Sequence, residues 1–152
     1  GPWDRPDMAL QKFTQNILKG ETINIFNHGK HKRDFTYIDD IIESLVRIID
    51  KPAKSNIEWI GKKPDPSSSK APWKIYNIGN NNPMNIMDYI NNLEKALKIK
   101  AKKKLLPLQP GDVPDTWANV DDLINDFDYK PDTTIENGIA NFVHWFKSYY
   151  QI

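Results

Sequence analysis

Apolar residues recur at helical spacing near the start of this chain, and the residues that flank them predict where the helix begins and ends. The pattern predicts a helix over residues 8–19, with Asp7 as its N-cap and Gly20 as its stop. The side chains on its apolar face are Leu10, Phe13, Ile17 and Leu18. This face is expected to pack against the rest of the protein.

A second helical segment is apolar almost all the way round. Asp39 or Asp40 is expected to cap it, and Lys51-Pro52 ends it. Its apolar side chains are Ile41, Ile42, Leu45, Val46, Ile48 and Ile49. A helix with so little polar surface is expected to be covered on more than one side.

Alternating and short apolar runs predict strands between the helices. Residues 23–26 form the first, with its two isoleucines pointing the same way, and further strands are predicted at 73–78 and 102–108. Residues 53–72 have a different character, with prolines, serines and lysines, and are expected to form a long surface loop.

Three more helices are predicted in the second half of the chain. Helical spacing covers residues 85–97, Asn119 is expected to cap a short helix, and Thr133 with Glu136 forms a capping-box pattern that opens the last one. The sum is a mixed α/β chain with about five helices and short strands, read as one domain over residues 1–152.

Composition excludes several function classes. With 21 basic and 20 acidic residues the net charge is +1, so no global field attracts nucleic acid. The chain has no cysteine, which excludes disulfides and thiol chemistry. No stretch reaches the ~20 apolar residues that cross a bilayer, and no leader pattern opens the chain, so we expect a cytoplasmic protein. The lysine run over residues 98–104 lacks interleaved aromatics and is read as a solvated edge.

The sequence carries no self-sufficient catalytic apparatus. It has no glycine-rich strand-to-helix turn for a dinucleotide and no Tyr-x-x-x-Lys pair for alcohol oxidation. His28, His31 and His144 do not combine with carboxylates at metal-ligand spacing. We therefore predict no catalytic residue, no cofactor-binding residue and no metal ligand in this chain.

Three segments have features of a binding site. The turn over residues 28–33 ends in Arg33 and can bring cationic side chains to a phosphate, although such turns are often only solvated. The turn that ends in Asp112 offers a carboxylate to a ribose diol, or serves simply as a turn. Arg5 can pair with a ligand carboxylate, or with Asp4 or Asp7 beside it.

In this order and spacing, these pieces resemble the extended short-chain dehydrogenase/reductase epimerases. The resemblance is greatest to the bacterial UDP-glucuronate 4-epimerases of capsule biosynthesis, and it runs through nearly the whole chain. The motifs that carry it are GPWDRPDMA (1–9), NHGK (27–30), RDFTYIDD (33–40), YNIGN (76–80), MDYI (87–90) and LPLQPGDV (106–113).

The resemblance implies a role for each candidate site residue. Arg33 would hold the UDP pyrophosphate, and Asp112 would bond the uridine ribose. Arg5 would meet the sugar carboxylate, although this chain has Asp4 where the family usually has glycine. Many relatives have arginine at the position of Gln109, whereas the glucuronate branch resembles this chain. The remaining candidates, beside the uracil or on the helix that closes over the nucleotide, are Ile25, Phe26, Leu10 and Lys12.

The resemblance also implies the cofactor and the partners. The parent enzyme would oxidise and re-reduce C4 of the sugar with NAD, using a Rossmann half that lies amino-terminal to this segment. We expect no NAD to bind this chain alone, and no activity without that half. Expected partners are a UDP-sugar and the amino-terminal half, in the same or a separate chain, or a second copy docked on the exposed apolar faces. No nucleic acid or membrane is expected.

Two alternatives stay open at this point. The same scaffold serves other nucleotide-sugar enzymes, including UDP-glucose 4-epimerases, dehydratases and decarboxylases, and the residues that decide between them would lie upstream. The chain begins abruptly, with no lead-in before Trp3, which also fits a non-catalytic truncated remnant or an interaction module.

Overall fold

Five α-helices and five short strands make up the computed structural model, which describes all of residues 1–152. This confirms the mixed α/β class. In chain order the elements are α1 (Ala9–Leu18), β1 (Thr22–Ile25), the 3-10 turn η1 (Asn27–Gly29), β2 (Lys32–Arg33), α2 (Ile38–Asp50), β3 (Met84–Asn85), α3 (Ile86–Leu97), β4 (Lys102–Leu105), β5 (Asp115–Thr116), α4 (Asp121–Phe127) and α5 (Ile135–Tyr150). No helix is both long and apolar enough to cross a bilayer.

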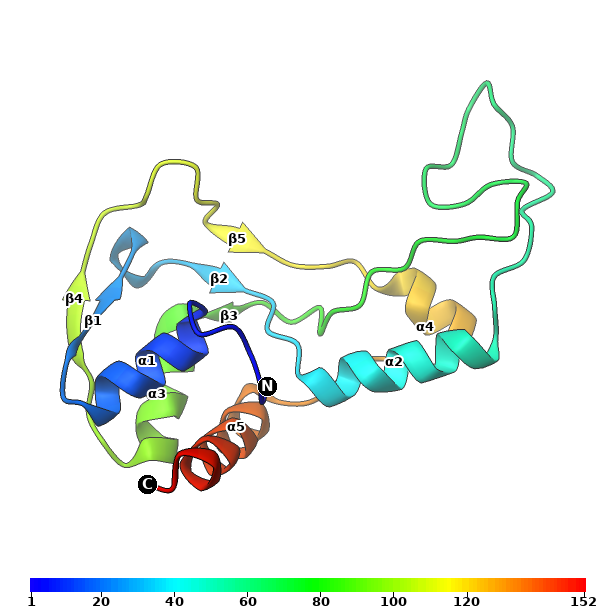
Figure 1. Cartoon of the computed structure of the whole chain (residues 1–152). Coiled ribbons are helices and arrows are strands. Elements are labelled where there is room, and N and C mark those ends of the chain that lie inside the picture. The colour runs from blue at the N-terminus through cyan, green and yellow to red at the C-terminus, as the bar shows by residue number, and fades with distance from the viewer.

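The strands form two small sheets (Figure 1). β1 runs parallel to β4, with Thr22 opposite Lys102 and Ile25 opposite Leu105. In the second sheet β2 lies in the middle, antiparallel to β3 and parallel to β5. Both parallel pairs join segments far apart in the sequence, β1 with β4 and β2 with β5.

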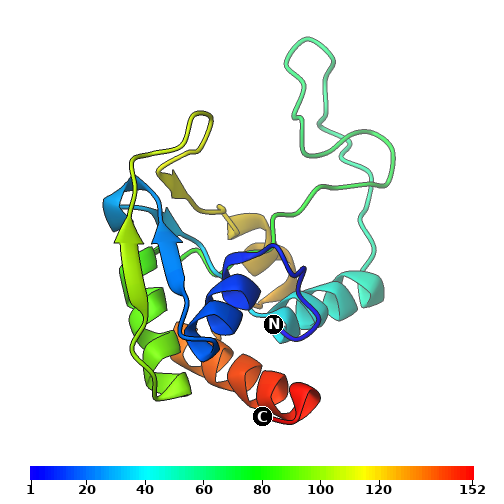
Figure 2. The ribbon, with the colours of Figure 1, turned by 60° about the vertical axis from the view of Figure 1, so that its left-hand side comes forward.

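The hydrophobic core lies between β1 and the helices α1, α3 and α5, on one side of the β1–β4 pair (Figure 2). Ile23 and Ile25 are both buried on the inner face of β1, as the alternation predicted, and the residues between and before them are exposed. Phe142 on α5 and Leu93 on α3 are fully buried, and α3 packs against α5. The apolar faces predicted for α1, α3 and α5 are therefore the faces that these helices bury in the core.

Helix α2 presents its polar side to the rest of the chain and its apolar side to solvent. Its only buried residues are Asp40 and Ser44. Arg47 donates to the carbonyl of Phe127 at the end of α4, and its guanidinium lies 4.7 Å from the centre of the Tyr129 ring. The apolar side chains that lie 40–75% exposed are Ile38, Ile42, Leu45, Val46 and Ile49, called here the α2 stripe. The cover that the sequence led us to expect is not supplied by this chain.

The predicted strand at 73–78 is wrong. Only an isolated bridge between Ser68 and Lys74 forms there, because no neighbouring strand offers a ladder of backbone partners. Lys74 and Tyr76 instead bond the Asp126 carboxylate on α4, at 2.8 and 2.6 Å. The preceding residues 53–72 form an irregular excursion that projects away from the helices in both views (Figures 1 and 2).

The caps predicted for the first two helices are also wrong. α1 begins after Met8, and the Asp7 carboxylate accepts hydrogen bonds from the Arg5 guanidinium instead of capping the helix. α2 begins after Tyr37, which places Asp39 and Asp40 in its first turn. Asp40 accepts from the Tyr129 hydroxyl and the Thr133 backbone N–H, each at 3.2 Å. The carboxylate expected to cap each helix is therefore bonded elsewhere: Asp7 to its near neighbour Arg5, and Asp40 to residues distant in the sequence.

Later boundaries differ from the predictions by a residue or a few. The helix predicted at 85–97 is confirmed as α3, with Asn85 accepting from the Met87 N–H at 2.8 Å. The last helix is capped by Thr134 and not by Thr133, and α4 follows Val120 although the Asn119 side chain accepts from its first turn. The strand expected at 102–108 ends at 105.

Candidate functional site

Strand β2 fixes the backbone around Arg33 between two neighbours. The Lys32 N–H donates to the Pro114 carbonyl at 3.0 Å, and the Asp34 N–H donates to the Thr116 carbonyl at 3.1 Å. These bonds hold Pro114 and Thr116 beside β2, along one of its edges. The turn that precedes β5 is thereby held close to Arg33.

Asp34 locks the end of β2 to two other segments. Its carboxylate accepts from the backbone N–H groups of Asn81, Asn82 and Ala118, at 3.0, 3.3 and 3.3 Å. Gly79 passes so close that an added Cβ would lie 2.9 Å from the Asp34 carboxylate and from the Ala118 methyl group. The Asp34 carboxylate thus has a structural role, since it ties the end of β2 to residues 81–82 and to Ala118.

Arg33 reaches across this junction to Asp112. Its Nη1 donates to the carbonyls of Lys32 and Pro114, at 3.0 and 2.8 Å, and its Nη2 donates to Asp112 Oδ1 at 2.9 Å. A guanidinium has five N–H donors, so two remain after these three bonds. The side chain is 26% exposed, which leaves those donors accessible while the carbonyls fix the plane of the group.

Asp112 is presented by a tight turn over residues 109–112. Its N–H donates to the Gln109 carbonyl at 3.2 Å, and Gly111 has a φ of +80°, the conformation that a type II turn requires at this position. The carboxylate is one-third exposed and has Arg33 on Oδ1 and His31 Nε2 3.3 Å from Oδ2. Each oxygen therefore retains capacity to accept a hydroxyl.

His31 is the residue of this cluster to which the sequence assigned no role. It is 7% exposed, and it precedes Arg33 by two residues on an extended segment. Residues two apart on a strand project to the same face, which is the signal that could have found it. Of the three side chains the imidazole is the most buried, and the guanidinium and the carboxylate are both partly exposed.

The structure places the other predicted residues in different surroundings. Ile25 is 2% exposed and belongs to the core, whereas Phe26 beside it is half-buried. Lys12 and Gln109 are exposed. Arg5 is exposed and forms an ion pair with Asp7 at 2.9 Å, which is the local alternative weighed from the sequence.

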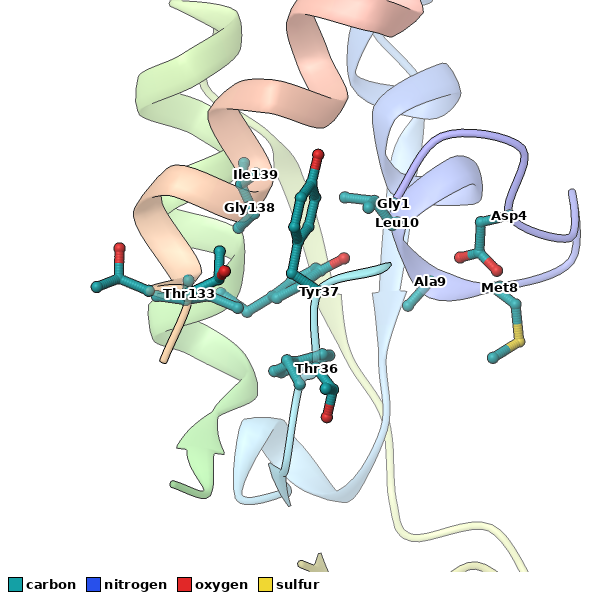
Figure 3. A pocket seen from close by; sticks show the side chains of 14 residues that line it. Gly1, Asp4, Met8, Ala9, Leu10, Thr36, Tyr37, Thr133, Gly138 and Ile139 are labelled. Carbon is teal, nitrogen blue, oxygen red and sulfur yellow. The ribbon is translucent and has the colours of Figure 1, made fainter. Parts of the chain in front are cut away.

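A mainly apolar pocket of about 190 Å³ lies between the start of α1, residues 35–37 and the start of α5. Figure 3 shows the Tyr37 ring standing between Gly138 of α5 and Leu10 of α1. The floor is formed by Tyr89, whose ring stacks on Phe35 at 4.3 Å between centroids and whose pKa is raised by burial. The pocket includes Leu10 but neither Arg33 nor Asp112, so the predicted residues fall into two groups.

The chemistry of the arrangement is that of binding. The guanidinium offers donors in a planar fork to an anion, and the carboxylate accepts from vicinal hydroxyls. No nucleophile and base are paired at this site, and residues 1–152 hold no group of three His, Cys, Asp or Glu side chains placed to bind a metal ion. The site fits a ligand that joins a phosphate to a diol.

Comparison with known sequences gives the family context. The sequence profile described as the NAD dependent epimerase/dehydratase family matches residues 1–79. Protein CapI of Staphylococcus aureus is 54% identical over 151 residues, covering 99% of this chain and 45% of its own length. UDP-glucuronate 4-epimerase 2 of Arabidopsis thaliana is 43% identical over 155 residues, covering 99% of this chain and 35% of its own length. The chain thus spans less than half the length of these relatives.

Solved structures share the fold over the whole chain. The UDP-glucuronic acid 4-epimerase of Bacillus cereus, in complex with UDP-glucuronic acid and NAD, superposes with a TM-score of 0.78 at 32% identity. The match covers 99% of this chain and 43% of that one. The dTDP-glucose 4,6-dehydratase of Bacillus anthracis reaches a TM-score of 0.77 at 19% identity, which is a likeness of fold alone. The architecture is therefore part of an extended short-chain dehydrogenase/reductase fold.

Proposed function

This chain belongs to the NAD dependent epimerase/dehydratase family, and we propose that it is the UDP-sugar-binding portion of a UDP-glucuronate 4-epimerase-like enzyme. The observation that carries the proposal is the Arg33–Asp112 pair, held at 2.9 Å by two segments nearly 80 residues apart. Surface ion pairs contribute little to stability, so a pair whose guanidinium is also fixed by two backbone carbonyls is better explained by recognition.

In the proposed complex the two free N–H donors of Arg33 face the pyrophosphate. The guanidinium plane is already set by the carbonyls of Lys32 and Pro114, so little rotamer freedom is lost on binding. Asp112 accepts from the ribose hydroxyls with its unused acceptor positions. A nucleoside diphosphate carries both a pyrophosphate for Arg33 and a ribose diol for Asp112, whereas a free sugar has no phosphate.

Arg5 supports the choice of a uronate as the sugar. Its guanidinium is 72% exposed and is occupied by Asp7, so a ligand carboxylate would replace one carboxylate partner with another. Because the pair it would break is exposed, the exchange costs little. We propose that Arg5 makes this contact and that UDP-glucuronate is preferred over UDP-glucose.

The residues of this chain do not fit an NAD site. The turn after β1 is the three-residue η1, and its Gly29 packs so closely on α3 that an added Cβ would lie 2.8 Å from Met87 Sδ. That glycine therefore serves the packing of η1 on α3. We propose that the cofactor and the hydride chemistry belong to a separate amino-terminal half, and that this chain alone does not turn over substrate.

Isothermal titration calorimetry of UDP and UDP-glucuronate into the chain tests the proposal. Arg33→Ala should weaken UDP binding about 10- to 100-fold, the effect of losing charge-assisted hydrogen bonds of about 1.5–3 kcal/mol. Arg33→Lys should recover only part of it, because the planar fork is absent. Arg47→Lys, on α2 and away from the site, is the matched control and should bind as the parent does.

The sugar preference has its own comparison. UDP-glucuronate should bind more tightly than UDP-glucose, and Arg5→Ala should abolish the difference while leaving UDP affinity unchanged. A folded chain that binds no UDP, or one in which Arg33→Ala binds as well as the parent, would contradict the proposed function.

A further inference from the structure

A bound diphosphate creates an electrostatic conflict at the site proposed above. Arg33 is the only cationic side chain that donates a hydrogen bond to Asp112. When the pyrophosphate of a UDP-sugar also draws on that guanidinium, one positive charge faces three negative charges, two from the diphosphate and one from Asp112. Like charges at this distance repel, and the site is only partly open to screening water.

His31 is placed to resolve the conflict. Its Nε2 lies 3.3 Å from Asp112 Oδ2, on the side of the carboxylate opposite Arg33. The nitrogen is buried and makes no hydrogen bond. Buried polar atoms without a partner are rare in native proteins, and an imidazole has a proton to gain near neutral pH.

We propose that His31 takes up a proton when a UDP-sugar binds, and that its imidazolium then donates to Asp112 Oδ2. This inference rests on the proposed function and adds to it a pH-dependent affinity. The proton comes from solvent and returns to it on release, and no covalent bond changes. With His31 charged, Arg33 is relieved of Asp112 and can direct its donors to the pyrophosphate.

The neighbouring charges do not offer another partner. Asp112 is the only carboxylate within ion-pair distance of His31. The other ionisable groups on the adjoining elements are His28 on η1, Lys30, Lys32, Arg33, Asp88 at the start of α3 and Asp115 on β5. Apart from Arg33, each of these is exposed, so solvent screens it more than it screens the buried imidazole.

Calorimetry in buffers of different ionisation enthalpy measures the proton directly. UDP-glucuronate is the ligand of choice because its pyrophosphate is a diester and no group on it titrates near neutral pH, unlike the terminal phosphate of UDP. The full chain should take up a substantial fraction of a proton at pH 7.5, and its affinity should fall several-fold from pH 6.5 to 8.0. His31→Gln keeps a donor of similar reach and should take up none, with a flat pH profile. Uridine, which lacks the diphosphate, should also bring no proton with it.

Nuclear magnetic resonance of the imidazole protons provides a test that needs no variant. The imidazole signals of His31 should shift toward their protonated positions when UDP-glucuronate saturates the chain, whereas those of the exposed His28 and His144 serve as internal references. Binding that depends on Arg33 but leaves the His31 signals unchanged, or brings no proton, overturns this inference and leaves the proposed function standing. Absence of binding to the folded chain overturns both.

Discussion

At the scale of the residue, Glu94 on α3 offers a test that is independent of the ligand site. Its carboxylate is 2% exposed and accepts from Lys100, Lys103 and the Ala101 N–H. Burial by itself would raise the pKa, but the hydrogen bonds from the two lysines and the backbone outweigh it and lower the pKa to about 2. A lowered folded-state pKa means that the carboxylate stabilises the fold at pH values above its unfolded pKa.

The stabilisation should be complete above about pH 4.5 and should be lost as the pH falls toward 2. Glu94→Gln should reduce the free energy of unfolding at pH 7 by about 2–3 kcal/mol, and its stability should depend less on pH in that window. Urea unfolding at several pH values measures both quantities. The exposed Glu58→Gln serves as the control, and parallel pH curves for the Glu94→Gln chain and the parent would contradict the argument.

The sequence identified candidate site residues where a short motif indicates their chemistry. It missed residues whose role depends on a partner that is distant in the sequence. Arg33 and Asp112 were both singled out as candidates, but nothing in the sequence said that they touch. His31 was grouped with its charged neighbours and given no function, because its burial depends on β3 and on the turn before β5. In the sequence Glu94 resembles any other acid on a helix, because its partners, Lys100 before β4 and Lys103 on β4, are brought to it by the fold.

At the scale of the element, the N-terminus of α5 distinguishes two adjacent threonines. Thr134 Oγ1 accepts from the Asn137 N–H at 3.3 Å, whereas Thr133 contributes only its backbone, to Asp40 and to Asn80. Thr134→Ala should therefore cost about 1 kcal/mol of stability, the usual effect of losing an N-cap. Thr133→Ala should cost clearly less. Chemical denaturation of the two variants decides the comparison, and a larger loss at Thr133 would restore the capping box expected from the sequence.

Periodicity found the helices because their hydrogen bonds are internal to each segment. All five lie where the spacing of apolar residues placed them, with ends displaced by a residue or a few. Strands depend on partners elsewhere in the chain, so their prediction was less successful. Residues 73–78 have a strand-like sequence but no ladder, and β2, β3 and β5 are only two residues long and carry no alternation to detect.

At the scale of the whole molecule, the α2 stripe predicts association. An apolar stripe along about three turns of one helix is too large a feature to be left to solvent in most monomeric proteins. We propose that it docks on a separate amino-terminal half or, without that half, on a second copy of this chain. Analytical ultracentrifugation of the chain alone should show a molecular mass that rises with concentration.

The double variant Leu45→Lys, Ile49→Lys should shift the chain toward the monomer with little change in melting temperature, because both side chains are exposed. Asp50→Lys, at the end of the same helix, adds charge without touching the stripe and should associate as the parent does. A chain that remains monomeric at high concentration and binds no apolar dye would remove the basis for this docking surface.

The parallel pairing of β1 with β4 has a consequence for how quickly the chain can fold. Each residue of β1 meets a partner 80 positions further along the chain, and β2 meets β5 across 83. Contacts between such distant segments form only after a large loop has closed. The entropy lost in closing that loop is not offset until the strand hydrogen bonds form, and this slows folding. The β2–β5 pairing that brings Arg33 near Asp112 adds to this range, so we expect the chain to fold slowly for its size.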